Sequence, residues 1–302
     1  MKLIKNAFIY RIDLPSADAL ENHLAEIRHR DILPSEFSNA GFVPAQENDL
    51  VANYDGGIAF AVRHDEKILP SSVVNEETKR RVKEIEDAND CRVSKVERQA
   101  IKEQVTVDLL KVSHVRTRTI TSFYHPASRF LIVPVSSRQQ AAVVTSLLVR
   151  AVGAAKTTTI NVSDVKGGLT TRLNEYLASF GDTDAFGKFS LSPEVWLKGE
   201  GGKVSYQIES IEAADKGLIE ALNGGMKVEA VRLGYGPASF KLTSDFTFKS
   251  VRFAEPEDNM EHEVMLAHWK HEAAIQVLGM VQAIEALCEL FDYKEPVSDG
   301  EK

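Results

Sequence analysis

The chain has 302 residues, of which 43% are hydrophobic and 26% are charged, with 18 Gly and 10 Pro. This composition excludes a disordered or fibrous chain and predicts a folded protein of two or three lobes. The two cysteines, Cys91 and Cys288, support neither a disulfide framework nor a thiolate metal cluster, and a net charge of −8 argues mildly against nucleic-acid binding if the charge is evenly spread.

The first seventy residues show strand patterns around one short helix. Alternating apolar side chains predict a half-buried strand over residues 8–12, followed by a helix over residues 16–30. Residues 41–44 are expected to turn into an extended piece, and residues 58–63 to form a strand that ends in a turn at residues 65–67. The opening residues lead into a strand and no run of eighteen apolar residues follows, so we expect a cytoplasmic protein without a membrane segment.

A helical pattern then runs from Val74 to about Val112. Asn75 is expected to cap its N-terminus, and the pattern predicts either one long helix or two in series, broken near residues 87–90. Nine basic and nine acidic residues lie between Asn75 and Lys111, so a solvated helix face is the alternative to a binding surface.

The charge along the chain is uneven. No Asp or Glu occurs between Asp108 and Asp164, whereas seven Lys or Arg residues and two His residues do. A strand over residues 130–135, a helix over 139–152 and a strand over 157–162 are predicted inside this basic segment. Such polarity indicates one surface that faces polyanions and another that is turned away from them.

The remaining chain predicts an antiparallel sheet and a terminal helix. A helix is expected over residues 169–180 and another over residues 259–291, and between them the strand patterns fall at residues 189–191, 204–208, 228–233, 240–243 and 246–253. Strands gather in clusters between helices, which predicts an α+β protein. We expect three regions: an N-terminal α+β region over 1–110, a basic strand–helix–strand region over 111–165 and a C-terminal sheet with its helix over 166–302.

Motifs for catalysis are weak. The chain has neither a phosphate-cradling glycine loop followed by a helix nor a Gly-x-Ser-x-Gly elbow, so we expect no enzyme and no cofactor. His268, His271 and Glu272 lie within about one helical turn and could ligate a metal, but structural or solvated histidines are the alternative.

Phosphate binding requires only basic side chains and hydrogen-bond donors on one face, and no catalytic motif. Arg116 and Arg118 would point to the same side of an extended segment, interleaved with the hydroxyls of Thr117 and Thr119. A basic strand offset by acids from another segment remains the alternative. No zinc finger, basic zipper or helix-turn-helix pattern is present, so base reading is not expected.

Several strings together resemble the RdgC family of bacterial recombination-associated proteins. They are Lys5-Asn6 with Tyr10-Arg11, Gly41-Phe42-Val43-Pro44, Glu66-Lys67-Ile68-Leu69-Pro70, Ile101-Lys102-Glu103 with Leu109-Leu110, Leu173-Asn174-Glu175-Tyr176-Leu177 and Phe248-Lys249-Ser250-Val251-Arg252-Phe253. The resemblance implies an α+β homodimer that closes into a ring around double-stranded DNA without sequence preference. It also implies that the protein restrains RecA-promoted strand exchange, and a location on the nucleoid follows.

Two positions depart from the family pattern. His114 stands where the family has an aromatic residue, and the strand that begins at Lys203 carries only one lysine and an added acid, Glu209. We therefore expect Arg116 and Arg118 to be the principal DNA contacts, with His114 beside them. Second-rank contacts are expected at Lys111, Lys203, Lys79, Arg80, Arg81, Lys95, Arg98 and Lys102.

Two other functions stay open. The chain could act mainly by docking on the recombinase through its acidic C-terminal helix, with Leu266, Trp269 and Leu278 as the contact surface. It could also be a metal-dependent nuclease that uses His268, His271 and Glu272.

Overall fold

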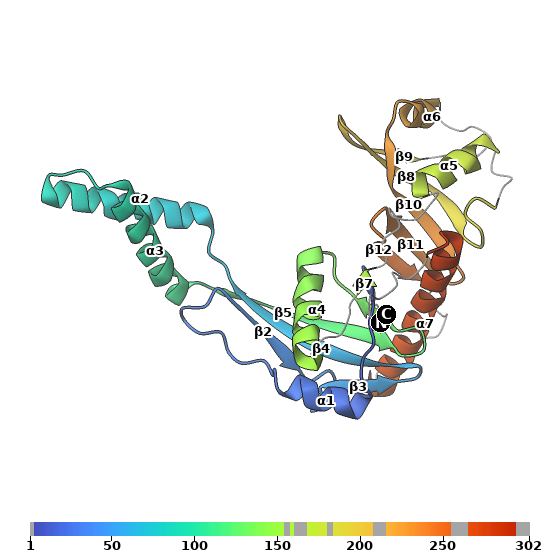
Figure 1. Ribbon diagram of the computed structural model, residues 1–302, viewed down its shortest axis with the longest axis horizontal. Helices are drawn as coiled ribbons and strands as arrows, with labels where there is room; N and C mark the ends of the chain where they lie inside the picture. The colour runs from blue at the N-terminus through green and yellow to red at the C-terminus, as the bar shows by residue number, and fades with distance from the viewer. Residues whose placement is uncertain are drawn as a thin grey trace, which may run out of the picture.

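The computed structural model describes residues 3–153, 158–159, 168–179, 184–207, 216–254 and 265–293. Within these ranges the chain forms seven helices and two antiparallel sheets, so the predicted α+β class is confirmed. The molecule is elongated, with a helical hairpin at one end, a large sheet in the middle and a smaller sheet at the other end (Figure 1).

The larger sheet has seven strands, in the order β2-β4-β5-β6-β1-β7, and β3 also pairs with β4. The strands are β1 (Phe8–Arg11), β2 (Ser38–Val43), β3 (Val51–Tyr54), β4 (Gly57–Lys67), β5 (Val115–His125), β6 (Phe130–Val133) and β7 (Thr158–Thr159). The first strand, the strand at 130–133 and the two described residues of the strand predicted over 157–162 are confirmed; the rest of that last strand lies outside the described residues.

Each face of this sheet is covered by helices. One face packs on α1 (Ala17–Ala25) and α4 (Arg138–Val152), and its core includes Phe60, Ile120 and Leu148. The opposite face, which carries Phe123 and Ile132, packs on α7 (Met265–Leu290). Because successive side chains of a strand point to opposite faces, the alternation along β4 and β5 builds both cores at once.

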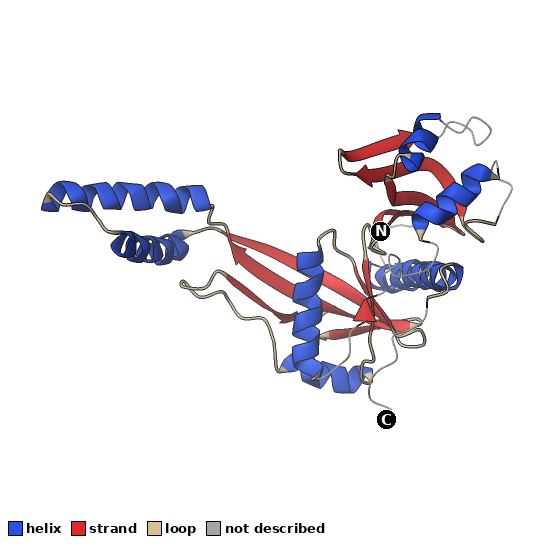
Figure 2. Cartoon of the chain, turned by 45° about the horizontal axis from the view of Figure 1, so that its top comes forward, coloured by secondary structure: helices blue, strands red, loops and turns tan. Residues whose placement is uncertain are grey.

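The smaller sheet has five strands, in the order β12-β11-β10-β8-β9. They are β8 (Ser190–Gly199), β9 (Gly202–Gln207), β10 (Lys227–Tyr235), β11 (Ala238–Thr243) and β12 (Phe248–Phe253), accompanied by α5 (Leu169–Ala178) and α6 (Lys216–Asn223). The predicted strands are confirmed, whereas α6 was not predicted. In Figure 2 this sheet stands apart from the larger one, with α7 between them.

Helix α7 belongs to the core. It is the one helix in the described chain whose length and composition would allow it to cross a membrane. Its buried residues, among them Ala273, Val277, Met280 and Ile284, pack with residues of both sheets in one cluster. A helix that is apolar on more than one side is expected between two layers, so packing accounts for its composition.

The N-terminal segment joins the two sheets. Ala7 pairs with Phe248 at the edge of β12, with N–H···O distances of 2.8 and 3.0 Å, before the chain enters β1. The N–H groups of Leu3 and Ile4 donate to Oε1 of Gln276 on α7, at 3.1 and 3.2 Å. Two layers that are distant along the sequence are therefore connected by the same few residues.

The helical hairpin consists of α2 (Ser71–Asn89) and α3 (Lys95–Val112) and projects from the ends of β4 and β5 (Figure 1). The break predicted near residues 87–90 is confirmed. The predicted cap at Asn75 is wrong, because α2 begins at Ser71 after Pro70. Ser94 does cap α3 in a reciprocal capping box with Glu97. We call these two helices the arm.

Two predicted turns are wrong. Asp65, Glu66 and Lys67 do not turn the chain but continue β4 as an eleven-residue strand. Gly41 lies inside β2, where a Cβ would come within 2.4 Å of the Cα of His29. The glycine at position 41 therefore permits a close backbone approach, which the hydrogen bonds between Phe42 and residues 27 and 29 hold in place.

Candidate nucleic-acid interface

Strand β5 carries Arg116 and Arg118, the two residues expected to contact phosphates. Ile120 and Tyr124 point from β5 into the core beneath α1 and α4, so the alternation places Arg116 and Arg118 on the same face of the sheet. Both arginines are exposed, because the core ends at Ile120. The extended segment assumed from the sequence is thus present.

The register of β4 against β5 brings acids beside this basic strand. Glu66 lies opposite Arg116 and forms an ion pair with it, at 2.5 Å between Oε2 and an Nη of the guanidinium. The hydrogen bond from Arg116 is the main cause that holds the pKa of Glu66 below its ordinary value. Arg116 is therefore offset by an acid of another segment, the alternative that the sequence left open.

Arg118 differs from Arg116. Its partner in the β ladder is His64, and no carboxylate of the described chain lies within ion-pairing distance of its guanidinium. An arginine without a carboxylate partner keeps its donors available for an anionic ligand. Of the two principal residues, Arg118 is the better placed for a phosphate.

The side chain of Asp65, on β4, forms a hydrogen bond with Thr117 of the neighbouring strand β5. The Asp65 carboxylate is buried, with 1% of the residue exposed, and it accepts from Nε of Arg63 at 3.1 Å and from the Thr117 hydroxyl at 2.7 Å. Nε2 of His29 lies 2.9 Å from its other oxygen. Burial alone would raise the pKa of Asp65, but the hydrogen bonds from Arg63 and Thr117 outweigh it and lower the pKa.

Lys111 and His114 lie where the arm meets β5. The Lys111 ammonium is 3.6 Å from a carboxylate oxygen of Asp108, and both groups are partly exposed. His114 is exposed, and its carbonyl accepts from the N–H of Ile68 at 2.9 Å. These residues continue the basic strand toward the arm.

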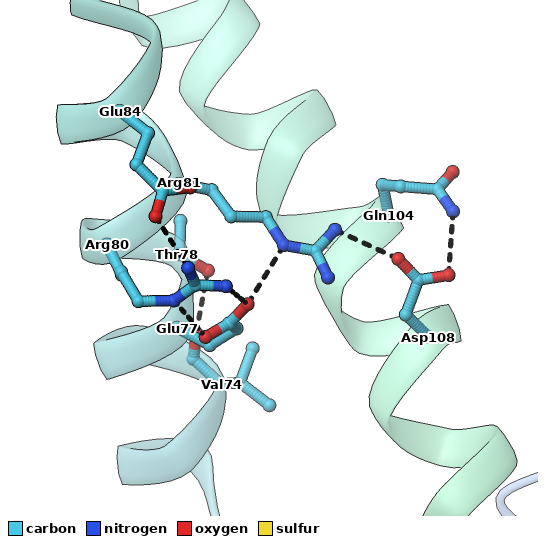
Figure 3. Close-up of polar contacts among 8 residues, drawn as sticks. All are labelled: Val74, Glu77, Thr78, Arg80, Arg81, Glu84, Gln104 and Asp108. Carbon is cyan, nitrogen blue, oxygen red and sulfur yellow. Dashed lines mark hydrogen bonds and ion pairs between the residues drawn. The ribbon is translucent and has the colours of Figure 1, made fainter. Parts of the chain in front are cut away.

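Part of the basic charge of the arm holds the two helices together (Figure 3). Arg80 pairs with Glu77 and Glu84, each at 2.6 Å, whereas Arg81 bridges Glu77 on α2 and Asp108 on α3, at 3.0 and 2.9 Å. The arginines in these pairs are partly exposed, so each pair contributes little energy alone. The other arm residues expected to contact DNA are exposed and form no ion pair within the described chain; they are Lys79, Lys95, Arg98 and Lys102.

Lys203 lies on the other sheet. It is the second residue of β9, the edge strand of the five-stranded sheet, and forms an ion pair with Glu229 of β10. The structure therefore groups Arg116, Arg118, Lys111 and His114 but places Lys203 apart from them.

The histidines considered for a metal site do not converge in the described part of the chain. His268 and His271 are exposed on α7, and Glu272 accepts from Nε2 of Gln276 at 2.9 Å. No group of three or more His, Cys, Asp or Glu in the described ranges could hold a metal ion. Cys91 and Cys288 are unpaired.

The surface considered for docking on a recombinase is only partly exposed. Trp269 is half-buried, with its ring centroid 6.4 Å from that of Phe123, whereas Leu278 is 50% exposed. The side chain of Leu266 lies outside the described residues.

A groove that the sequence did not predict adjoins Arg118. It has a volume of about 580 Å³ and contains a second cation, Lys5, together with Gln140 at the start of α4. The only signal in the sequence was the string Lys5-Asn6, which contributed to the family resemblance. Nothing in the spacing of residues 5 and 118 indicates that they share a surface.

Known proteins are similar to this chain along nearly its whole length. A family model described as "Putative exonuclease, RdgC" matches residues 3–294. Similar proteins named recombination-associated protein RdgC occur in Shewanella loihica, with 26% identity over 95% of this chain and 96% of the relative, and in Shewanella frigidimarina, with 25% identity over 95% and 97%.

Proposed function

The chain belongs to the RdgC family, and we propose that it binds double-stranded DNA without sequence preference. The proposal includes a ring-shaped homodimer that encircles the duplex and restrains RecA-promoted recombination on the nucleoid. The relatives are named for recombination, which supports a role on DNA.

The observation that carries the proposal is the basic face of β5. Arg118 is exposed without a carboxylate partner in the described chain, and Lys111, His114 and Arg116 lie along the same path. A protein with a net charge of −8 would repel DNA unless its positive charge were gathered on one surface. Phosphate contacts of this kind give affinity without sequence preference.

A salt series tests the binding. Each phosphate that the protein neutralises contributes about −0.9 to the slope of log K against log salt concentration. We expect Arg118→Gln to reduce the magnitude of this slope by about 0.9, and Arg116→Gln to reduce it less, because Glu66 already offsets Arg116. Lys188→Gln, which removes one exposed lysine paired with Glu289, is the control and should leave the slope unchanged. A slope near zero for the unaltered protein would refute DNA binding through phosphates.

A second measurement tests the ring. An encircling dimer slides off the ends of linear duplex but persists on a nicked circle of the same sequence, so the two substrates should differ in lifetime at equal salt. Equal lifetimes would exclude encirclement, although the protein could still bind DNA without enclosing it. Sedimentation of the free protein gives the oligomeric state, for which a dimer is expected.

The other functions are separated in the same preparation. The family description names an exonuclease, so end-labelled duplex incubated with Mg²⁺ or Mn²⁺ decides whether the protein shortens DNA. We expect no shortening, because the described residues bring no three metal-binding side chains together. If the protein bound RecA equally well with and without DNA, docking on the recombinase would replace DNA occupancy as the means of restraint.

A further inference from the structure

The groove beside Arg118 is lined in part by the N-terminal segment that joins the two sheets. Its walls come from the N-terminal segment, β5, the connection from β6 to α4, the first turn of α4, and Trp269 on α7. Lys5 belongs to the segment that pairs with β12, whereas Arg118 belongs to β5 of the larger sheet. Two cations that belong to different layers thus line the same open groove of about 580 Å³.

The lining suits an anion. Besides Lys5 and Arg118 it contains the hydroxyls of Thr119, Thr121 and Ser136 and the amides of Asn6 and Gln140, and no Asp or Glu is among its lining residues. Hydroxyl and amide donors beside two cations are the groups that proteins use for phosphate oxygens. A metal site would call for carboxylate, imidazole or thiolate ligands, and no Asp, Glu, His or Cys is among the lining residues.

The edge of β5 is open along the groove. β5 pairs with β4 from Val115 to Tyr124 but with β6 only from Phe123 to His125, because β6 ends at Val133 and the chain turns toward α4. Among the described residues, no strand pairs with the other side of residues 115–122. The free edge of a strand presents both N–H and C=O groups, and the N–H groups among them can add donors to the groove.

The Lys5 backbone is held in place before any ligand arrives. The carbonyl of Lys5 accepts from Val251 at 2.8 Å, and Oδ1 of Asn6 accepts from the N–H of Ser250 at 3.2 Å. The N–H groups of Leu3 and Ile4 donate to Oε1 of Gln276. A fixed backbone reduces the entropy that the site loses when it binds a ligand.

From these features we propose that the groove is a subsite for a backbone phosphate of DNA, held between Lys5 and Arg118. The inference rests on the proposed function and names Lys5, Gln140 and the edge of β5 as parts of the DNA contact. It extends the contact from the exposed face of β5 into the junction of the two sheets, and Trp269, which also lines the groove, lies within reach of the bound strand.

Tryptophan fluorescence can report on this groove separately from binding. The chain has two tryptophans, and Trp196→Phe leaves Trp269 as the single reporter while it keeps an aromatic ring beside Lys241. The probe is a 24-base-pair duplex, added to the full chain across a salt series. We expect the duplex to change the emission of Trp269, and Lys5→Gln to abolish this change.

Lys5→Gln should also reduce the magnitude of the salt slope by about 0.9, so that a tenfold rise in salt costs about eightfold less affinity than in the unaltered protein. Lys188→Gln is the matched control and should alter neither readout, and thermal unfolding checks that both variants fold.

Three outcomes would overturn the inference. If the duplex binds with a normal slope but leaves Trp269 emission and the Lys5→Gln slope unchanged, the groove is not part of the contact although the proposed function stands. If the protein binds no duplex, both proposals fail. If a glutamate-rich peptide changes the emission and the duplex does not, the open edge of β5 receives a strand and not a phosphate.

Discussion

The buried carboxylate of Asp65 holds several parts of the larger sheet together. It connects β4, β5 and the segment before β2 through Arg63, Thr117 and His29. We expect Asp65→Asn to lower the free energy of unfolding by about 2 kcal/mol, because hydrogen bonds to a charged group are lost while their partners remain. Urea denaturation at neutral pH measures this loss. Glu66→Gln alters an exposed pair next to it and should cost less than 1 kcal/mol.

The same residue predicts a pH dependence. Because the pKa of Asp65 in the folded chain is below its ordinary value of 3.8, its ionised form stabilises the fold above the pKa of the unfolded chain. That stability is lost as the pH falls below about 4, through the lowered pKa. Urea midpoints between pH 3 and pH 6 should therefore fall less steeply for Asp65→Asn than for the unaltered protein. Parallel curves would show that another carboxylate controls the acid limb.

The ion pair with Glu66 reduces the positive charge that Arg116 presents to DNA. Glu66→Gln removes the carboxylate that pairs with Arg116, so we expect tighter DNA binding and a salt slope larger in magnitude by up to about 0.9. The double variant with Arg116→Gln should lose this gain, and filter binding at several salt concentrations measures both. A gain that survives in the double variant would come from Arg118, whose charge also lowers the pKa of Glu66, or from net charge.

Among the helices and strands, the spacing of apolar residues predicted those elements whose position is determined by their own local sequence. The helices at 138–152 and 169–178 and the strands of the smaller sheet follow from apolar spacing that each segment carries itself. The register of β4 against β5 does not, because it joins residues about fifty positions apart, and only that register shows that Glu66 meets Arg116. The charged triplet at residues 65–67 resembles a turn until the partners of Asp65 are known.

The arm depends on local interactions more than the sheets do. The N–H of Glu97 donates to the Ser94 hydroxyl at 3.3 Å, and the N–H of Ser94 donates to the Glu97 carboxylate at 2.8 Å. We expect Ser94→Ala to weaken α3 by about 1 kcal/mol, seen as roughly fivefold faster amide hydrogen exchange in the arm and unchanged exchange in β4. Ser71→Ala is the control, since α2 has no side-chain cap bond. Equal effects of the two variants would show that the capping box contributes nothing.

At the scale of the whole molecule, Gln276 connects the N-terminal segment to α7. It is 3% exposed and its Oε1 accepts from both Leu3 and Ile4. We expect Gln276→Leu to destabilise the protein by about 2 kcal/mol, because the buried N–H of Ile4 and the partly buried N–H of Leu3 lose their acceptor. Calorimetry measures the loss, and Gln99→Leu on the exposed face of α3 is the control. An unchanged transition would mean that the sheets are joined by other contacts.

The sequence could not predict this junction. Residues 3–7 precede the first strand pattern, and their partners lie more than two hundred positions away on β12 and α7. The family resemblance pointed to Lys5 and Asn6 without a physical reason for either. The three-dimensional junction supplies that reason, because it brings Lys5 into the groove that Arg118 also lines.

The place of the arm within the chain has a consequence for protein engineering. Lys67 and Val115 are ladder partners, and Ile68 bonds to His114 at the point where the arm leaves the sheet. The arm is thus an insertion within what would otherwise be an ordinary β-hairpin. A chain in which Asn-Gly replaces residues 68–114 has the loop length that a tight hairpin prefers, so this shortened protein should retain both sheets and offer a way to study the remaining surface alone.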